Sequence, residues 1–325
     1  SRSTEEEAAT RSSRDLDAEN GTAESITIQL NAEGKPAGSG DDGNWYYDPS
    51  SGGRLYLYNG GFTLKPSSES GAESALQGVE LIINQNADFA DGTVGCWTNN
   101  AGIISGGTFQ QPVNNNKTIS DGTFQGEVFN YGTISDGTFQ GEVYNHNTIS
   151  GGTFQGGEVY NVRGAISGGT FEKRMTLMND DASITISDGL FKGEVSTGIC
   201  RFPLSISGGL FTKAVDVSHV YNPTDLSITG GYFVSKPTVP NGSDIAFTSV
   251  SDQDGRKFQV PVNDDWSESY TSLYVPRGSS GQHNTITVKT NTKLLYYLAD
   301  GERFPVLDSD RDSYVYQIPV RNNEK

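Results

Sequence analysis

Residues 104–109 read Ile-Ser-Gly-Gly-Thr-Phe, and residues 119–124 read Ile-Ser-Asp-Gly-Thr-Phe. This motif recurs first at intervals of 15 residues and later at intervals of 17, 20 and 22 residues. Upstream, Gly60-Gly61-Phe62 is interpreted as a worn copy of its Gly-Gly-Thr-Phe turn. A short, nearly fixed period is typical of architectures in which each unit stacks on its neighbours. The sequence therefore predicts a solenoid with coils beginning at Ile104, Ile119, Ile134, Ile149, Ile166, Ile186, Ile206 and, more loosely, Ile228.

Residues 118–132 show how one coil is built. Successive side chains of a strand point to opposite faces, so Ile119, Phe124 and Val128 point inward from three short strands. Asp and Gly between these strands favour tight corners. Asn130 has a counterpart in each regular coil, and stacked amides can hydrogen-bond from coil to coil. The pattern predicts an all-β chain, a parallel β-helix or three-faced β-solenoid with about 15–22 residues per coil.

The spacing of the motif also divides the chain into parts. A solenoid end needs a cap, because an open coil exposes strand edges and core. Short β-like segments after the last motif favour a separate β domain. The predicted parts are a disordered tail or linker at 1–22, an N-terminal cap with irregular first coils at 23–103, the regular β-solenoid at 104–240, and a small C-terminal all-β domain at 241–325.

Composition and charge exclude some partners. The 325 residues carry a formal net charge of -17. An acidic surface repels nucleic-acid phosphates and anionic lipids, so we expect no nucleic-acid partner. No apolar run approaches the ~20 residues of a membrane span, so we expect no membrane insertion. The chain begins at Ser1 and is poor in Lys, and we expect a mature or excised piece of an exported protein.

Cys96 and Cys200 are the two cysteines of the chain. About six coils separate them, which at ~4.8 Å per coil corresponds to roughly 29 Å. A disulfide needs Cα atoms within ~7 Å of each other. We therefore expect two unpaired thiols that are buried as small hydrophobic groups.

The Ile-Ser-Gly-Gly-Thr-Phe coils and the later stretch ITGGYFVSKPT, residues 228–238, resemble the repeat regions of cell-surface proteins from Gram-positive gut bacteria. The resemblance covers residues 100–240. It implies an extracellular β-solenoid on a larger protein of the bacterial cell surface. The family is mostly uncharacterised, so it supplies no catalytic residues. The sequence contains no LPXTG-like sorting signal, which leaves the mode of attachment open.

Outward positions on the third strand of the regular coils form two parallel ladders. Like charges opposite one another on neighbouring strands are destabilising, so three carboxylates ~4.8 Å apart with no in-register Lys need an explanation. A glycan is one explanation, because rings stack on sugars and acids accept hydroxyl hydrogen bonds. Bound Ca²⁺ is another, and a solvated face with shielding aromatics is a third. The ladders are Glu127, Glu142 and Glu158, and Phe129, Tyr144 and Tyr160.

A second outward pattern combines Thr and Gln. Regular Thr arrays on flat solenoids suggest an ice-binding surface, whereas β-propensity and solubility also account for them. Gln in place of a second Thr weakens the ice-binding interpretation. Asp121, Asp136 and Asp188 occupy a motif position that is otherwise Gly, which favours a role in the turn. The Thr ladder is Thr108, Thr123, Thr138, Thr153 and Thr170, with Gln110, Gln125, Gln140 and Gln155 beside it.

The longer coils offer the residues for an enzyme. Their extra segments follow the motif Phe and should bulge from one side. Polysaccharide lyases with a β-helix fold pair a basic residue with carboxylates to abstract a proton beside a uronate, and basic residues gather here. No spacing motif supports this reading over ordinary surface cations. The candidates are Arg163, Lys173, Arg174, Arg201 and His219.

Metal and cofactor motifs are weak. Asp308, Asp310 and Asp312 imitate the start of a calcium loop, but Ser313 and Pro319 replace the Gly and Glu that such a loop requires. The three histidines lack metal-ligand spacing, and no nucleophile elbow or phosphate loop occurs. We therefore expect no cofactor apart from the Ca²⁺ considered above.

The leading interpretation is a non-enzymatic, extracellular rod or adhesin module whose partners are glycans or host and bacterial surface components. A polysaccharide-acting enzyme, a lyase or hydrolase that uses the longer coils, is the alternative. A cation-stabilised or ice-binding solenoid is a further alternative. The residues leave the oligomeric state and the identity of the ligand open.

Overall fold

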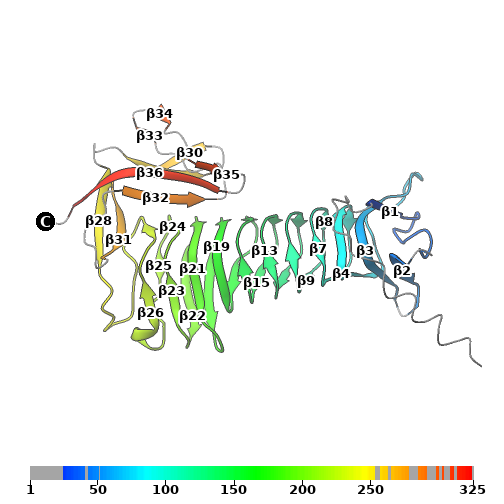
Figure 1. Ribbon diagram of the computed structural model, residues 1–325, viewed down its shortest axis with the longest axis horizontal. Helices are drawn as coiled ribbons and strands as arrows, with labels where there is room; N and C mark the ends of the chain where they lie inside the picture. The colour runs from blue at the N-terminus through cyan, green and yellow to red at the C-terminus, as the bar shows by residue number, and fades with distance from the viewer. Residues whose placement is uncertain are drawn as a thin grey trace, which may run out of the picture.

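The computed structural model describes residues 25–40, 43–50, 52–252, 257–262, 265–277, 285–290, 298–299, 302–303, 308–310 and 313–323. The expected tail at 1–22 lies outside these residues. The described chain is all-β apart from one short 3₁₀ helix, η1 (Pro223–Asp225). Parallel strands stack into a β-solenoid, and the eight motif copies form consecutive turns of it (Figure 1). The predicted fold class is confirmed.

The solenoid has three faces, and each face is a parallel sheet. The first contains β7 (Ile103–Ile104), β10 (Thr118–Ile119), β13 (Thr133–Ile134), β16 (Thr148–Ile149), β23 (Leu204–Ile206) and β26 (Leu226–Ile228). The second contains β5 (Thr93–Val94), β8 (Thr108–Phe109), β11 (Thr123–Phe124), β14 (Thr138–Phe139), β17 (Thr153–Phe154), β24 (Leu210–Phe211) and β27 (Tyr232–Phe233). The longer strands β19 (Gly164–Phe171) and β21 (Ile184–Phe191) run through both faces. The third contains β6 (Thr98–Asn100), β9 (Val113–Asn115), β12 (Val128–Asn130), β15 (Val143–Asn145), β18 (Val159–Asn161), β20 (Met175–Asn179), β22 (Val195–Cys200) and β25 (Val215–Asp216).

The motif Phe residues form one continuous stack along the core. Consecutive ring centroids from Phe109 to Phe233 lie 4.5–5.1 Å apart, and the ring planes differ by only 5–11°. An edge-on ring meets each end of this Phe ladder: Phe89 meets Phe109 at 61°, and Phe247 meets Phe233 at 81°. Before Phe109 the column continues with Val94. Identical residues therefore repeat in register from Phe109 to Phe233.

A buried Asn ladder runs parallel to the Phe ladder. The side-chain Nδ2 of each Asn donates to the Oδ1 of the next, at 2.7 Å in all four steps. The same nitrogen of Asn130 also donates to the carbonyl of Thr148, at 3.0 Å. Because every member is fully buried, these bonds satisfy amides that water cannot reach. The ladder, which confirms the predicted Asn corner, comprises Asn100, Asn115, Asn130, Asn145 and Asn161.

The turn inside the motif depends on its second glycine. This residue has a positive φ between 89° and 130° in all eight copies, a region that favours glycine. The preceding position tolerates Asp because the carboxylate accepts a hydrogen bond from that glycine. The Asp121 Oδ1 accepts from Gly122 N at 2.7 Å, and Asp136 does the same for Gly137 at 2.8 Å. The predicted turn role of these aspartates is confirmed.

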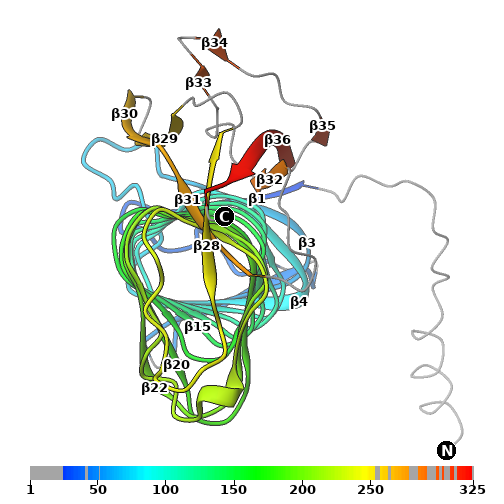
Figure 2. The same ribbon diagram turned by 90° about the vertical axis from the view of Figure 1, so that its left-hand side faces the viewer.

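The longer coils widen the solenoid on one side. Leu177 continues the column of Asn161, and strands β20 and β22 add a further inward position, which Asn179 and Cys200 fill. Figure 2 shows the resulting lobe below the narrower regular coils. The extra residues therefore enlarge the core as well as the surface. Cys96 and Cys200 are both free and buried, as predicted, and burial raises the pKa of their thiols to about 12 and about 11.

The N-terminal coils correct one interpretation. Phe62 of Gly60-Gly61-Phe62 pairs in register with Phe89, and Phe89 pairs with Ile104. The segment thus continues the column of motif Ile residues, and it is not a copy of the Gly-Gly-Thr-Phe turn. A larger Phe replaces Ile where the coil is irregular. The strands here are β1 (Ser25–Gln29), β2 (Trp45–Asp48), β3 (Arg54–Lys65) and β4 (Glu80–Asp91).

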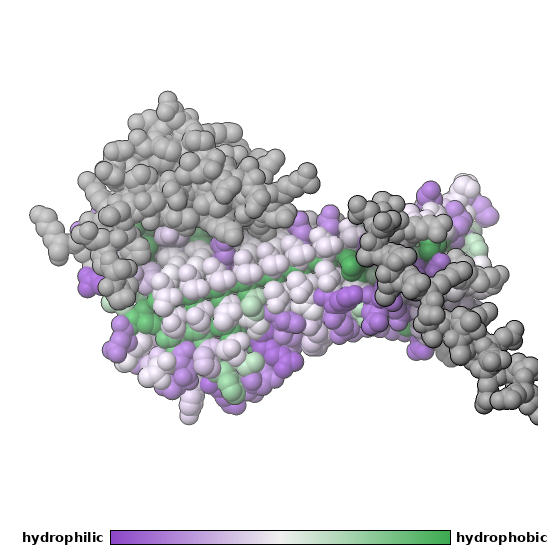
Figure 3. Space-filling model, in the orientation of Figure 1, coloured by the Kyte–Doolittle hydropathy of each residue, from purple (hydrophilic) through white to green (hydrophobic). Residues whose placement is uncertain are grey.

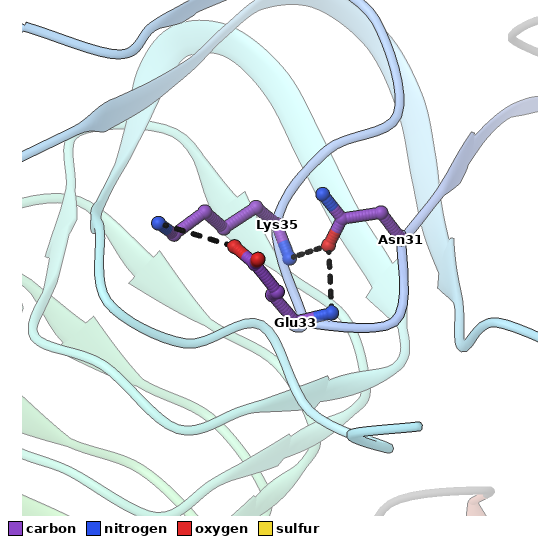
Figure 4. Close-up of polar contacts among 3 residues, drawn as sticks. All are labelled: Asn31, Glu33 and Lys35. Carbon is purple, nitrogen blue, oxygen red and sulfur yellow. Dashed lines mark hydrogen bonds and ion pairs between the residues drawn. The ribbon is translucent and has the colours of Figure 1, made fainter. Parts of the chain in front are cut away.

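A tight turn after β1 closes this end. The Asn31 Oδ1 accepts hydrogen bonds from the backbone nitrogens of Glu33, at 3.0 Å, and Lys35, at 2.9 Å (Figure 4). Gly34 in this turn has a φ of 73°, and a Cβ there would collide with the Ala75 carbonyl. The Gly34 carbonyl in turn accepts from Gln77 N at 2.9 Å. The turn is therefore anchored to the segment that leads into β4.

The C-terminal strands continue from the solenoid. Phe233 pairs antiparallel with Tyr274 of β31 (Leu273–Pro276), which pairs with β28 (Phe247–Asp252). β28 then pairs with β36 (Ser313–Asn322), and β36 pairs with β32 (Thr285–Thr290) and β35 (Asp308–Asp310). Figure 1 shows β32 and β36 running back along the solenoid, and β32 contacts β21. The remaining strands are β29 (Phe258–Val262), β30 (Asp265–Tyr270), β33 (Leu298–Ala299) and β34 (Glu302–Arg303).

We predict that Phe139→Ala, in the middle of the Phe ladder, destabilises the solenoid by roughly 3–5 kcal/mol, since a fully buried ring is lost and a cavity remains. Urea denaturation followed by circular dichroism measures the change. The exposed neighbour Gln140→Ala is the control and should change the free energy of unfolding by less than about 0.5 kcal/mol. If the two substitutions lowered the free energy of unfolding equally, the buried Phe139 ring would not be what stabilises the coil.

Candidate functional site

The third face presents the two outward ladders that the sequence predicts. The register of β12, β15 and β18 places Phe129 beside Tyr144 and Tyr144 beside Tyr160. The Glu residues precede the paired Val residues of the same strands and occupy the neighbouring column. We call these six residues the Glu/aromatic strip. The structure brings together Glu127, Glu142, Glu158, Phe129, Tyr144 and Tyr160.

The rings of the strip cover one another. Phe129 and Tyr144 have centroids 5.1 Å apart with planes at 12°, and Tyr144 and Tyr160 lie 4.9 Å apart at 10°. Nearly parallel rings this close must overlap face to face. Both faces of Tyr144 are therefore occupied by its neighbours. A ligand that approaches the middle of the strip meets ring edges, hydroxyl groups and carboxylates.

The phenol groups supply the partners of the carboxylates. The Tyr144 hydroxyl donates to Glu142 Oε2 at 2.7 Å, within the same strand. This hydrogen bond is the main reason that the pKa of Tyr144 rises to about 12. A hydrogen bond to Glu158 likewise raises the pKa of Tyr160. The Glu ladder is thus stabilised by neutral donors, and no group of three or more acidic, His or Cys side chains in the described part of the chain has metal-binding geometry.

The column of Glu residues continues with Arg174, which the sequence suggested as a residue of an enzyme site in the longer coils. Val159 pairs with Met175, so Arg174 follows Glu158 in the column. The Arg174 guanidinium donates to Ser196 Oγ, with Nη2 at 2.9 Å. A positive charge therefore ends the row of three carboxylates. Arg174 follows Glu158 by 16 residues, so a search at a fixed spacing of 15 residues does not find it.

Toward the N-terminus, the strip gains an aromatic residue and a polar network. The Trp97 ring lies 6.5 Å from Phe129 at 24°, and Trp97 is 41% exposed. Beside it, Asn99 Nδ2 donates to Glu80 Oε1 at 2.6 Å, and Arg54 Nε pairs with Glu80 Oε2 at 3.0 Å. Sequence reasoning missed Trp97, although it stands 30 residues before Glu127, at twice the repeat length.

The Thr ladder of the second face is also in register, as Thr108, Thr123, Thr138 and Thr153 pair in succession. Figure 3 shows residues of successive coils aligned in rows along the length of the solenoid. The next member, Thr170, is buried, and the ladder then changes to the buried Leu190 and Leu210. β32 contacts β21, the strand that contains Leu190. The replacement of Thr by Leu in the motif marks the coils in which this outward position is buried and apolar.

The basic residues of the longer coils lie in separate places. Arg163 pairs with Asp181 at 2.6 Å, and Arg201 pairs with Asp180 at 2.9 Å, so both converge on one turn. Arg174 lies apart from them, in the column of the strip. Lys173 and His219 are exposed.

Near His219, a short polar chain forms within one loop. The Ser218 hydroxyl donates to Asp216 Oδ1 at 2.6 Å and lies 3.4 Å from His219 Nδ1. The Ser218 backbone nitrogen donates to the same Asp216 oxygen at 3.0 Å, and these bonds lower the pKa of Asp216. Because the hydroxyl proton points to the carboxylate and the backbone completes a turn, this chain organises the loop.

The remaining sequence candidates lie at the C-terminus. Asp308 and Asp310 belong to strand β35, which pairs with β36, whereas Asp312 lies outside the described residues. Within the described part of the chain, no helix has the length and apolar character of a membrane span. Comparisons with protein-family models, curated proteins and solved structures find no match to this chain. The resemblance to surface repeats of gut bacteria therefore stays a prediction from the residues.

We predict that Tyr144 ionises at about pH 12 and that Glu142→Gln moves this pKa toward the ordinary value near 10, because the carboxylate holds the phenol proton. A raised pKa in the folded state means that the bond contributes stability below pH ~10 and loses it as pH rises toward 12. The difference in tyrosinate absorbance between the protein and its Tyr144→Phe variant reports this titration. An unshifted titration in the Glu142→Gln variant would show that the hydrogen bond is not the cause.

Proposed function

We propose that this protein is a non-enzymatic, extracellular rod of the bacterial cell surface that acts as an adhesin module and contacts glycans along the Glu/aromatic strip. The observation that carries the proposal is the strip itself, a row of hydroxyls and carboxylates repeated in register on one face of a stacked solenoid. The exported character and the bacterial surface location rest on the sequence resemblance.

The core supports the role of a rod. The Phe ladder runs without interruption from Phe109 to Phe233, and the Asn ladder joins the coils from Asn100 to Asn161. The regular coils are therefore held to one another by both packing and side-chain hydrogen bonds. Eight coils at ~4.8 Å each give a stacked body of roughly 38 Å. Before Phe109, Val94 and Leu76 of earlier coils continue its column, and at the other end Phe247 meets Phe233 edge-on. Such a body holds its surface groups at fixed intervals.

The chemistry of the strip supports contact with sugars. Carboxylates accept hydrogen bonds from sugar hydroxyls, and the Tyr hydroxyls can exchange partners between Glu and ligand. Phe129 and Tyr160 cover the two faces of the Tyr144 ring, so a sugar ring has little room to stack in the middle of the strip. There the strip recognises sugar hydroxyl groups through Glu127, Glu142 and Glu158. The net charge of -17 disfavours strongly acidic polymers.

We predict that the protein binds neutral glycans on a glycan array and that Glu142→Gln/Glu158→Gln weakens this binding at least about tenfold, the effect of losing two hydrogen bonds to a charged group. The Tyr144→Ala/Tyr160→Ala variant should weaken it as well, because these hydroxyls lie beside the carboxylates. Gln125→Ala on the second face is the control, since this exposed residue lies outside the strip. No glycan binding, or binding that the strip variants leave unchanged, would count against the proposal.

A further inference from the structure

An open hollow of about 530 Å³ lies at the N-terminal end of the strip, on the corner between the second and third faces. Its volume falls within the range of ~300–1,000 Å³ typical of sites for small molecules. Four glycines line it, Gly52, Gly53, Gly78 and Gly95, together with a basic, an acidic and an aromatic side chain. The three side chains are those of Arg54, Glu80 and Trp97.

The hollow exists because the early coils differ from the regular ones at this corner. A Cβ at Gly52 would meet no atom within 4 Å, and one at Gly78 would meet only the Lys35 side chain, at 3.6 Å. The register aligns Gly95 with Gln110 and Gln125 of the next two coils. The regular coils therefore carry a side chain at a position where this corner has a glycine. Irregular coils at this end create space as well as a cap.

Three side chains in successive coils line the hollow and carry the groups that sugars need. Trp97 is among the residues that line it, and its stacking partner Phe129 lies 6.5 Å away along the strip. An exposed indole offers an apolar surface for the C–H face of a sugar ring. Arg54 and Glu80 supply polar groups, and their side chains are 48% and 31% exposed. The Arg54 guanidinium can donate hydrogen bonds to a sugar, and the Glu80 carboxylate can accept them. A 3.0 Å ion pair between the two, and the hydrogen bond from Asn99 to Glu80, hold both groups in place.

The charges around the hollow balance. Arg54 pairs with Glu80, and at the rim Lys35 pairs with Glu33 at 3.6 Å. A site with one cation for each anion favours a neutral polyhydroxyl ligand over a uronate or a phosphate. The acidic surface of the whole chain disfavours anions further.

We propose that this hollow binds one end or one unit of a neutral oligosaccharide, which stacks on Trp97 and donates and accepts hydroxyl hydrogen bonds at Arg54 and Glu80. This inference rests on the proposed glycan contact. It adds that a sugar ring stacks on Trp97, whose indole is exposed beside the hollow. The oligosaccharide then continues along the carboxylates of the strip.

The test is calorimetric titration of the full chain with maltohexaose, cellohexaose and chitohexaose, and with polygalacturonate as the acidic counterpart. We expect at least one neutral hexasaccharide to bind and polygalacturonate not to bind. Trp97→Ala should weaken the binding at least tenfold, and Trp97→Phe, which keeps an aromatic face, should weaken it less. Tyr221→Ala, at an 83% exposed aromatic residue of the wide coils, is the matched control and should leave binding unchanged. Circular dichroism of each variant confirms that it folds.

The outcomes separate this inference from the proposed function. Binding that the Glu142→Gln/Glu158→Gln variant loses but Trp97→Ala retains would overturn the site at the hollow and leave the strip in place. Loss with Trp97→Ala alone would support the hollow and remove the strip from the contact. Preference for polygalacturonate would contradict the neutral ligand, and a wild-type protein that binds none of the hexasaccharides would contradict both proposals.

Discussion

The stacking of each coil on an identical coil is the interaction on which the rest of the structure depends. A regular coil has only about one inward apolar residue per face, which is too little to form a core alone. Phe124 packs between Phe109 and Phe139, and Asn130 hydrogen-bonds to the Asn of the coils on both sides. Every coil therefore obtains its core contacts from its neighbours, as expected for repeats with nearest-neighbour energetics. The identity of these inward residues is constrained by the residues above and below them.

This constraint acts less on the outward positions, and the regular coils differ from one another mainly there. The second-face column changes from Thr to the buried Leu190 and Leu210. The third-face column changes from Trp97 to Glu127 and then to Arg174. Because the backbone repeats, any group placed outward is presented at a fixed spacing from the next. We infer that the residues in these outward columns determine the function of this chain.

Much of this arrangement follows from the sequence. Strand alternation within one coil predicted that Ile119, Phe124 and Val128 are buried, and the repeat predicted the Asn ladder and the two free thiols. The repeat did not predict that Phe62 occupies an Ile column, because the irregular coils change both the spacing and the size of the inward residue. Residue identities placed Glu142 and Tyr144 together. They could not show that ring stacking covers the faces of Tyr144 or that the phenol donates to the carboxylate, since both depend on side-chain rotamers.

Removal of one whole coil tests the central claim most directly. Deletion of residues 119–133 takes out 15 residues and brings Ile134 into the place of Ile119, so the Phe and Asn ladders remain continuous. The account predicts a folded protein with a single cooperative unfolding transition and a β-type circular dichroism spectrum. Deletion of 14 residues, 119–132, puts Thr133 in the inward position and should prevent folding of the solenoid. Equal stability of the two deletion variants would contradict the claim that in-register stacking between coils holds the structure together.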